Sequence, residues 1–202
     1  MSCCLKSRPG EWTISVPLQI VEVQGEGRTL RARESIRAGV ELWRERVPAA
    51  GASEDELEAT LLEAFERNGP DAFWPAGASG KPEDLEADRA SASAGDFRQL
   101  ATGLRGSCYQ LGRHVLLRVT ALLNHACAPS KEANACIAWC GGCHKPVEEG
   151  RVISVIASRD IAAGDLLRIS YNRFFEPQHL DDILTTHGFV CRCSACRDVP
   201  SA

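Results

Sequence analysis

The stretch Gly188-Phe189-Val190-Cys191-Arg192-Cys193-Ser194-Ala195-Cys196, near the end of the chain, decides how the rest of the sequence is interpreted. Its three cysteines follow a C-x-C-x-x-C pattern, one ligand short of the four thiolate or imidazole ligands that a tetrahedral zinc ion takes. Cys127, at the end of the upstream stretch Asn124-His125-Ala126-Cys127, is the best placed fourth ligand. The sequence therefore predicts one zinc ion bound by Cys127, Cys191, Cys193 and Cys196, which would hold the tail against the Asn-His stretch. Without a fourth ligand the tail cysteines would be free thiols.

Length and composition indicate one compact domain. The 202 residues are 44% hydrophobic and 25% charged, which is ordinary for a globular protein. The ten cysteines follow an N-terminus without a signal-peptide pattern, so we expect thiols and metal ligands rather than disulfides. The net charge of -4 argues against direct nucleic-acid binding, and no apolar run approaches the ~20 residues of a membrane helix. We expect cytoplasmic or nuclear residence.

The order of strand-like and helix-like segments divides the chain into four parts. Residues 11–50 and 111–175 are β-rich, and residues 51–110 are a helical insertion between them. Residues 176–202 hold a helix over roughly 177–187 and then the cysteine-rich tail. Strands are expected where β-branched and aromatic residues run between turn residues, at 12–16, 18–23, 40–43, 135–139, 152–157 and 166–171.

The insertion opens with a helix. Ser53-Glu54-Asp55-Glu56 is a capping box, in which Ser53 caps the first turn and Glu56 bonds back to it. Leu57, Leu61 and Phe65 then recur at a spacing of four. This spacing places them on one face of the predicted helix.

Motifs in both β-rich halves occur in the order of a known family. They are Gly25-Glu26-Gly27-Arg28, Ile36-Arg37-Ala38-Gly39, Asn124-His125-Ala126-Cys127-Ala128-Pro129-Ser130, Ile161-Ala162-Ala163-Gly164-Asp165-Leu166-Leu167, Ile169-Ser170-Tyr171 and the cysteine tail. This order resembles the SET domain of protein lysine methyltransferases followed by a post-SET segment. The helical insertion is most similar to the SMYD-type branch, whose MYND zinc finger is missing here. Thr29, Ser130 and Leu166 stand where the family has a glycine, an asparagine and a glutamate.

The resemblance implies an α+β, β-rich SET fold of short twisted sheets with a pseudoknot, the helical insertion and a zinc-binding post-SET segment. It also implies transfer of a methyl group from S-adenosylmethionine to a lysine side chain of a protein substrate. Tyr171 would be the catalytic residue, with its hydroxyl where the amine and the methyl group meet. The residues implied to bind the cofactor are Gly25, Gly27, Arg28, Asn124, His125, Tyr171 and Phe189.

Two alternatives stay open. A SET fold can lose its activity, so the chain could be a non-catalytic SET-fold module that binds a peptide or a partner protein in the same cleft. Cys136, Cys140, Cys143 and His144 could hold a second metal ion, although their place at the tip of the predicted hairpin favours exposed thiols.

Overall fold

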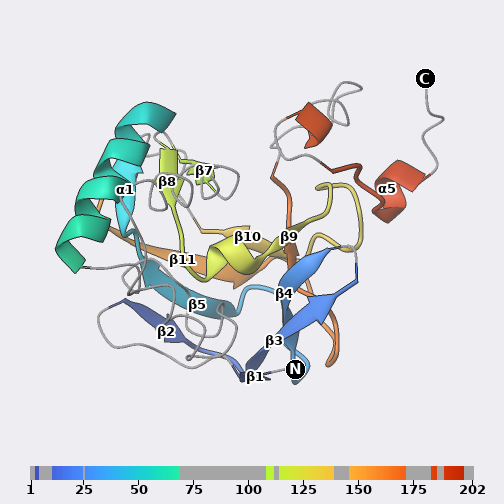
Figure 1. Ribbon diagram of the computed structural model, residues 1–202. Helices are drawn as coiled ribbons and strands as arrows, with labels where there is room; N and C mark the ends of the chain where they lie inside the picture. Colours follow the sequence, from blue (N-terminus) through green and yellow to red (C-terminus); the bar gives the residue numbers. More distant parts are fainter. Residues whose placement is uncertain are drawn as a thin grey trace.

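Among the residues that it describes, the computed structural model arranges short strands in three sheets, with one long helix at their side (Figure 1). It describes residues 3–4, 11–24, 26–68, 108–111, 114–138, 146–171, 183–185 and 189–197. Gly25, Cys140, Cys143, His144 and the side chain of Phe65 lie outside this description. In the part of the chain that is described, no helix is long and apolar enough to cross a membrane.

The largest sheet has six strands and joins both halves of the chain. Its order is β2 (Trp12–Ile14), β5 (Glu41–Arg46), β11 (Val152–Ala157), β10 (Ala135–Ile137), β12 (Arg168–Ile169) and β9 (Asn124–His125). Neighbours are antiparallel except for β12, which runs parallel to both β10 and β9. The predicted pairing of the segments at 135–139 and 152–157 is confirmed, with Ile137 opposite Val155.

A second sheet carries Glu26 and Gly27 of the Gly25-Glu26-Gly27-Arg28 motif, which is called the glycine turn below. It consists of β1 (Cys3–Cys4), β3 (Leu18–Val23) and β4 (Gly27–Ala32), and a bridge between Arg31 and Leu166 connects it to the approach of β12. Gly27 has a φ of 73°, in the left-handed region that glycine adopts without strain. An added Cβ there would meet no atom within 4 Å, so the backbone conformation rather than crowding favours glycine.

The third sheet lies under the helix. It consists of β6 (Ala49–Gly51), β8 (His114–Leu116) and β7 (Cys108–Gln110), and α1 (Glu54–Asn68) packs against β6 and β8 (Figure 1). At Gly51 an added Cβ would collide with the backbone of Leu57. The close approach of the first helical turn to β6 therefore requires glycine at this position.

The capping box of α1 is confirmed. Ser53 Oγ accepts the N–H of Glu56 at 3.2 Å, and Glu56 Oε2 accepts the N–H of Ala52 at 2.7 Å. Two backbone donors at the start of the helix thereby gain partners, as a capping box provides. Leu57 and Leu61 are both buried, so the face that their spacing indicated packs inward.

β12 is inserted between two strands that follow one another in the chain. Because β12 lies between β9 and β10, the segment 126–134 that joins those strands must cross it. Asn134 fixes the crossing: its Nδ2 donates to the Leu166 carbonyl at 2.9 Å, and its Oδ1 accepts the Arg168 N–H at 3.0 Å. The segment leading to Tyr171 thus lies beside the Asn-His loop, as the SET resemblance implied.

Several predicted boundaries differ from the structure or lie outside it. The strand expected at 166–171 is reduced to β12, and residues 183–185 are helical within the helix expected over 177–187. A short helix, α5 (Ser194–Arg197), was not predicted. Residues 172–182 lie outside the description, so threading of the tail as a pseudoknot stays a prediction. The division into four parts also stays a prediction.

One hydrophobic core lies between the first two sheets. Its fully buried members include Trp43, Leu30 and Leu123. Leu123 immediately precedes β9, so the core fixes the start of the Asn-His strand.

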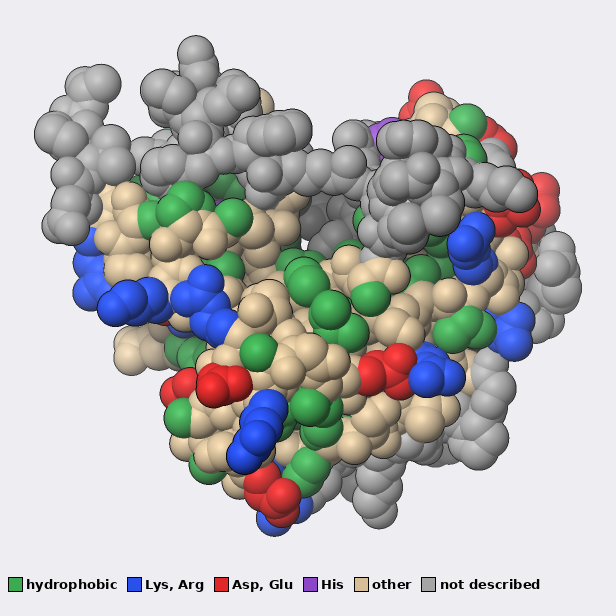
Figure 2. All heavy atoms as spheres, turned by 180° about the vertical axis from the view of Figure 1, so that it is seen from behind, with side chains coloured by type: hydrophobic (Ala, Val, Ile, Leu, Met, Phe, Trp, Pro, Cys, Tyr) green, Lys and Arg blue, Asp and Glu red, His purple; other side chains and the backbone are tan. Residues whose placement is uncertain are grey.

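On the face opposite to the view of Figure 1, the described acidic and basic side chains are interspersed with hydrophobic ones (Figure 2).

Candidate functional site

Four cysteines from two distant parts of the chain form one buried cluster. The Sγ atoms of Cys127, Cys191, Cys193 and Cys196 all lie within 4.8 Å of one another. Cys127 Sγ is 3.8 Å from Cys191 Sγ and 3.3 Å from Cys196 Sγ, and Cys193 Sγ is 3.5 Å from Cys196 Sγ. Zinc–sulfur bonds of about 2.3 Å in a tetrahedron place the sulfur atoms about 3.8 Å apart. The four predicted ligands are therefore together, at close to the separation that one such ion requires.

Protonation differs among these thiols. Burial raises the pKa of Cys127 and Cys196, that of Cys196 to about 12. Burial acts in the same direction on Cys193, but hydrogen bonds, with the Cys127 backbone first, lower its pKa to about 7. A cation bound by thiols favours their thiolate form. A metal ion at the centre of the cluster would therefore remove the protons that burial retains.

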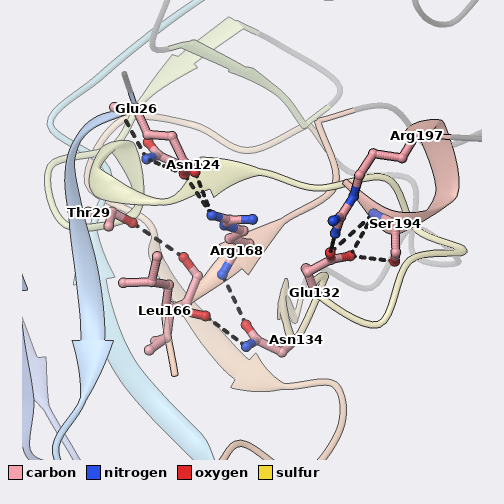
Figure 3. A network of polar contacts seen from close by, with 10 residues as sticks. Glu26, Thr29, Asn124, Glu132, Asn134, Leu166, Arg168, Ser194 and Arg197 are labelled. Atoms are coloured by element: carbon pink, nitrogen blue, oxygen red, sulfur yellow. Dashed lines mark hydrogen bonds and ion pairs between the residues drawn. The ribbon is translucent and has the colours of Figure 1, made fainter. Parts of the chain in front are cut away.

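A second contact holds the tail to the loop between β9 and β10. The Glu132 carboxylate accepts the Ser194 N–H at 3.1 Å on both oxygens and the Ser194 hydroxyl at 2.7 Å. Arg197 pairs with the same carboxylate at 3.3 Å (Figure 3). Burial acts to raise the pKa of Glu132, but the hydrogen bonds from Ser194 outweigh it and lower that pKa to about 2. Glu132 therefore anchors α5 by contacts that need no metal.

Three aromatic rings from different segments meet beside the cysteines. The ring of His125 on β9 lies 5.1 Å from that of Tyr171 and 6.0 Å from that of Phe189, measured between centroids. Tyr171 and Phe189 meet edge to face at 6.4 Å. Three of the predicted cofactor-binding residues are thus neighbours, and Phe189 of the tail remains 36% exposed.

His125 connects this ring cluster to the cysteines. Its Nδ1 accepts the backbone N–H of Tyr171 at 3.1 Å, and its Nε2 lies 3.3 Å from Cys127 Sγ. Because Nδ1 is an acceptor, the hydrogen-bond pattern assigns the ring proton to Nε2, facing the sulfur. The imidazole therefore orients Tyr171 on one side and a predicted zinc ligand on the other.

The Tyr171 hydroxyl has a fixed direction. It donates to the Leu123 carbonyl at 2.7 Å, one residue before Asn124. Burial raises the pKa of Tyr171 to about 12, so the phenol keeps its proton at neutral pH. The hydroxyl can orient a bound group by hydrogen bonding, but it is a poor base.

Over residues 27–172, more than half of its length, the chain matches the SET domain family. The chain belongs to the SET domain family. Its structure is similar to the SET domain of LSMT bound to lysine and AdoHcy, with a TM-score of 0.56 and 15% identity over 90% of this chain and 54% of that one. It is also similar to Rubisco LSMT bound to AdoMet, with a TM-score of 0.53 and 16% identity over 90% of this chain and 53% of that one.

This SET domain spans about half the length of the two LSMT chains. At such low sequence identity the likeness shows the fold alone. A comparison with curated proteins finds none that matches.

The glycine turn of the SET domain is held against β9 by charged and polar groups. Asn124 Nδ2 donates to the Glu26 carbonyl at 3.1 Å and to Glu26 Oε2 at 3.4 Å. Arg168 Nη2 contacts both carboxylate oxygens of Glu26, at 2.7 and 2.8 Å (Figure 3). Gly27 and Arg28 are exposed next to this cluster. Gly25 lies outside the description, so its predicted role is not placed.

Two departures from the family pattern are accommodated by the fold. Thr29 is fully buried, and its hydroxyl donates to the Leu167 carbonyl at 3.5 Å, so its side chain turns away from the exposed side of the glycine turn. Ser130 is also buried, and its Oγ accepts the Ala133 N–H at 3.3 Å. Asn134, four residues later, makes the bonds that fix the crossing over β12.

Sequence reasoning missed a buried carboxylate near the site that accepts several hydrogen bonds. Glu45 on β5 is 1% exposed, and it accepts the N–H groups of Arg118, Val119 and Thr120 at 2.7, 2.9 and 2.9 Å. The Trp43 indole and the Thr120 hydroxyl donate to it as well. These donors begin the 3₁₀ helix η2 (Thr120–Leu122), which leads directly to β9. Glu45 therefore positions the strand that carries Asn124 and His125.

A cavity of about 490 Å³ lies beside β10 and β12. It is lined by Leu111, Ala128, Ala133, Ala135, Cys136, Ile137, Ser158, Arg159, Ile169 and Ser170. Burial raises the pKa of the Cys136 thiol, which lies at this wall. The other three residues of the alternative second metal site are outside the description, so that alternative stays untested.

Proposed function

We propose that this SET domain is an S-adenosylmethionine-dependent protein-lysine N-methyltransferase in which Tyr171 is the catalytic residue. The observation that carries the proposal is the hydrogen bond from the Tyr171 hydroxyl to the Leu123 carbonyl, within the ring cluster of His125, Tyr171 and Phe189. The LSMT structures of similar fold are bound to AdoHcy or AdoMet, which supports the choice of cofactor.

The residues present suit such a cofactor. The rings of Tyr171 and Phe189 offer apolar surface for an adenosine, and a ring exposed to the extent of Phe189 can stack on a base. Gly27 leaves open space at its Cβ position, where Arg28 and Asn124 are also near the surface. The Glu26–Arg168 pair places both signs of charge at the same edge, as a zwitterionic amino acid requires.

Tyr171 and Leu123 would arrange the transfer. When bound, S-adenosylmethionine supplies a methyl group on a positively charged sulfur. The Tyr171 proton is committed to the Leu123 carbonyl, so toward a substrate amine the phenol oxygen acts as an acceptor that sets the direction of the amine lone pair. A lysine amine has a pKa of about 10.4 in water, and burial favours its neutral form, the one that attacks. The protein contributes position and exclusion of water rather than a nucleophile or a base.

We also propose that the cysteine cluster binds one zinc ion through Cys127, Cys191, Cys193 and Cys196. The distances between the four sulfur atoms, which suit tetrahedral coordination, and the burial of the four cysteines support zinc. The segment after β12 would then be a post-SET tail, which brings Phe189 against His125. The proposal further includes a SMYD-type relationship, a protein substrate without direct nucleic-acid contact, and cytoplasmic or nuclear residence.

Replacement of Tyr171 by phenylalanine tests the assignment of the catalytic residue. We expect Tyr171→Phe to bind S-adenosylhomocysteine as wild type does, because the ring packing remains. Stability should change by no more than about 1 kcal/mol, the contribution of one hydrogen bond. Methyl transfer should slow by at least about tenfold, because the lost orientation matters mainly in the transition state.

The assay uses radiolabelled S-adenosylmethionine with a panel of histones and cell lysate, alongside melting curves and a titration with S-adenosylhomocysteine. Tyr109→Phe, the same change at the only other tyrosine of the chain, is the matched control. Equal rates for Tyr171→Phe and wild type would show the assigned role to be wrong. If wild type binds no cofactor at millimolar concentration, the non-catalytic protein-binding module becomes the better explanation.

A further inference from the structure

A charged cluster stands where the glycine turn meets the Asn-His strand. Arg168 on β12 and Asn124 on β9 are paired in register, so their side chains leave the sheet on the same face. Both reach Glu26 of the turn before β4 (Figure 3). The Arg168 side chain is 18% exposed and that of Glu26 is 38% exposed, so the pair is accessible from solvent.

The backbone ladder already holds these elements together without the ion pair. β12 is bonded to both of its neighbours, and β4 is bonded to β3 along its whole length. Partly exposed ion pairs contribute little to stability. Among the described residues, Arg168 also keeps a buried Nε without a hydrogen-bond partner. The pair is therefore better suited to a ligand than to holding the fold.

We propose that Arg168 and Glu26 recognise the amino-acid end of the methyl donor, Arg168 its carboxylate and Glu26 its ammonium. This inference rests on the proposed function. A guanidinium matches a carboxylate with two parallel hydrogen bonds, and a carboxylate matches an ammonium. In the ligand-free protein the two side chains neutralise each other.

When the zwitterionic end of the methyl donor binds, its carboxylate replaces Glu26 as the partner of Arg168, and its ammonium replaces Arg168 as the partner of Glu26. Each side chain gives up one opposite charge and gains another, so no charge is left buried and unpaired. The Asn124 amide, which already bonds the Glu26 carbonyl, keeps the turn in place during the exchange. The guanidinium of Arg168 can then present Nε as well as Nη2, which gives the orphaned donor a partner.

Ligands that differ in this end of the molecule provide the test, and each ligand is compared between wild type and the variants. S-adenosylhomocysteine carries both charges, decarboxylated S-adenosylmethionine lacks the carboxylate, and 5′-methylthioadenosine lacks the amino-acid end. Dissociation constants are measured by calorimetry for wild type, Arg168→Met, Arg168→Lys and Glu26→Gln. Arg44→Met removes the arginine of a surface pair with Glu41 and serves as the matched control.

We expect Arg168→Met to bind S-adenosylhomocysteine about 10- to 100-fold more weakly, from the loss of charged hydrogen bonds. Its affinity for 5′-methylthioadenosine should match that of wild type, and its affinity for decarboxylated S-adenosylmethionine should not fall. Arg168→Lys should fall between, since it keeps the charge and loses the planar fork. Glu26→Gln should weaken both ligands that carry the ammonium and leave 5′-methylthioadenosine unchanged.

Equal binding of S-adenosylhomocysteine by wild type and the Arg168 variants overturns this inference and leaves the proposed function standing. Equal weakening of all three ligands also overturns it, because that pattern indicates damage to the whole pocket. If wild type binds none of the ligands, the proposed function fails and this assignment fails with it. Arg168→Lys keeps the test valid should Arg168→Met not fold.

Discussion

Replacement of Glu45 by glutamine should destabilise the protein far more than a like change on its surface. Oε2 of Glu45 accepts the N–H groups of Arg118 and Val119, and Oε1 accepts those of Thr120 and the Trp43 indole. A glutamine amide must place its NH₂ at one of these two ends. Either the N–H groups of Arg118 and Val119 or the N–H group of Thr120 then faces another donor, whereas the Trp43 indole keeps the Thr120 hydroxyl as an acceptor at 3.2 Å.

The expected cost follows from these bonds. Each buried donor left without an acceptor costs about 1–3 kcal/mol, so the loss of one or two acceptors in Glu45→Gln should cost about 1–6 kcal/mol. For a chain of this length each kcal/mol lowers the melting temperature by about 2–4 °C, so a fall of at least about 2 °C is expected. Affinity for S-adenosylhomocysteine should fall too, because η2 leads directly to Leu123 and β9.

The control is Glu41→Gln, the same change on the same strand. Glu41 pairs with the exposed Arg44 at 2.7 Å and accepts the Ser154 hydroxyl at 2.8 Å. Such a surface pair contributes less than about 1 kcal/mol. Melting is followed by circular dichroism and binding by calorimetry. If Glu45→Gln melts at the same temperature as Glu41→Gln, the buried carboxylate does not have the role assigned here.

Two further predictions concern the tail. Elemental analysis should find one zinc ion per chain. Cys196→Ser should abolish zinc binding and expose residues 189–197 to proteolysis, whereas Cys136→Ser, at the cavity wall, should keep the zinc ion. Wild-type protein that contains no metal but has a protease-resistant tail would contradict the prediction. Glu132→Gln should loosen α5 at neutral pH. Because the pKa of Glu132 is lowered from 4.5 to about 2, the difference in unfolding free energy between the variant and wild type should be full above about pH 4.5. This difference should vanish as the pH falls through about 2. Denaturant titrations from pH 7 to 2 measure that difference, and one that grows on acidification would show the sign to be wrong.

The parts of the fold that were predictable from sequence are those that local patterns encode. The capping box at Ser53 and the spacing of Leu57 and Leu61 describe contacts within a few residues of each other. The four cysteines were also predictable, although Cys127 is 64 residues from Cys191, because a metal requires a fixed number of ligands of one chemical type. The spacing of residues and the number of candidate metal ligands can both be read directly from the sequence.

The polar residues that hold the site together carry no such local signal. Glu45 lies between two arginines at the end of β5, and only the fold shows that it faces inward toward Thr120. Asn134 and Glu132 lie in a loop whose crossing over β12 cannot be deduced from the spacing of its residues. From the sequence alone Arg168 is indistinguishable from an ordinary surface arginine, and only its pairing with Asn124 across β12 and β9 places it at the site.

These hidden contacts connect the cysteine cluster to the proposed transfer site through very few residues. Cys127 lies against His125, His125 accepts the backbone N–H of Tyr171, and Tyr171 donates to the Leu123 carbonyl. Leu123 in turn follows η2, which Glu45 holds. Displacement of the tail therefore acts on the Tyr171 ring from one side, and loss of Glu45 acts on its acceptor from the other. Because both ends of this chain of contacts are buried, we expect a change in the cysteine cluster or in Glu45 to shift the hydroxyl on which the proposed chemistry depends.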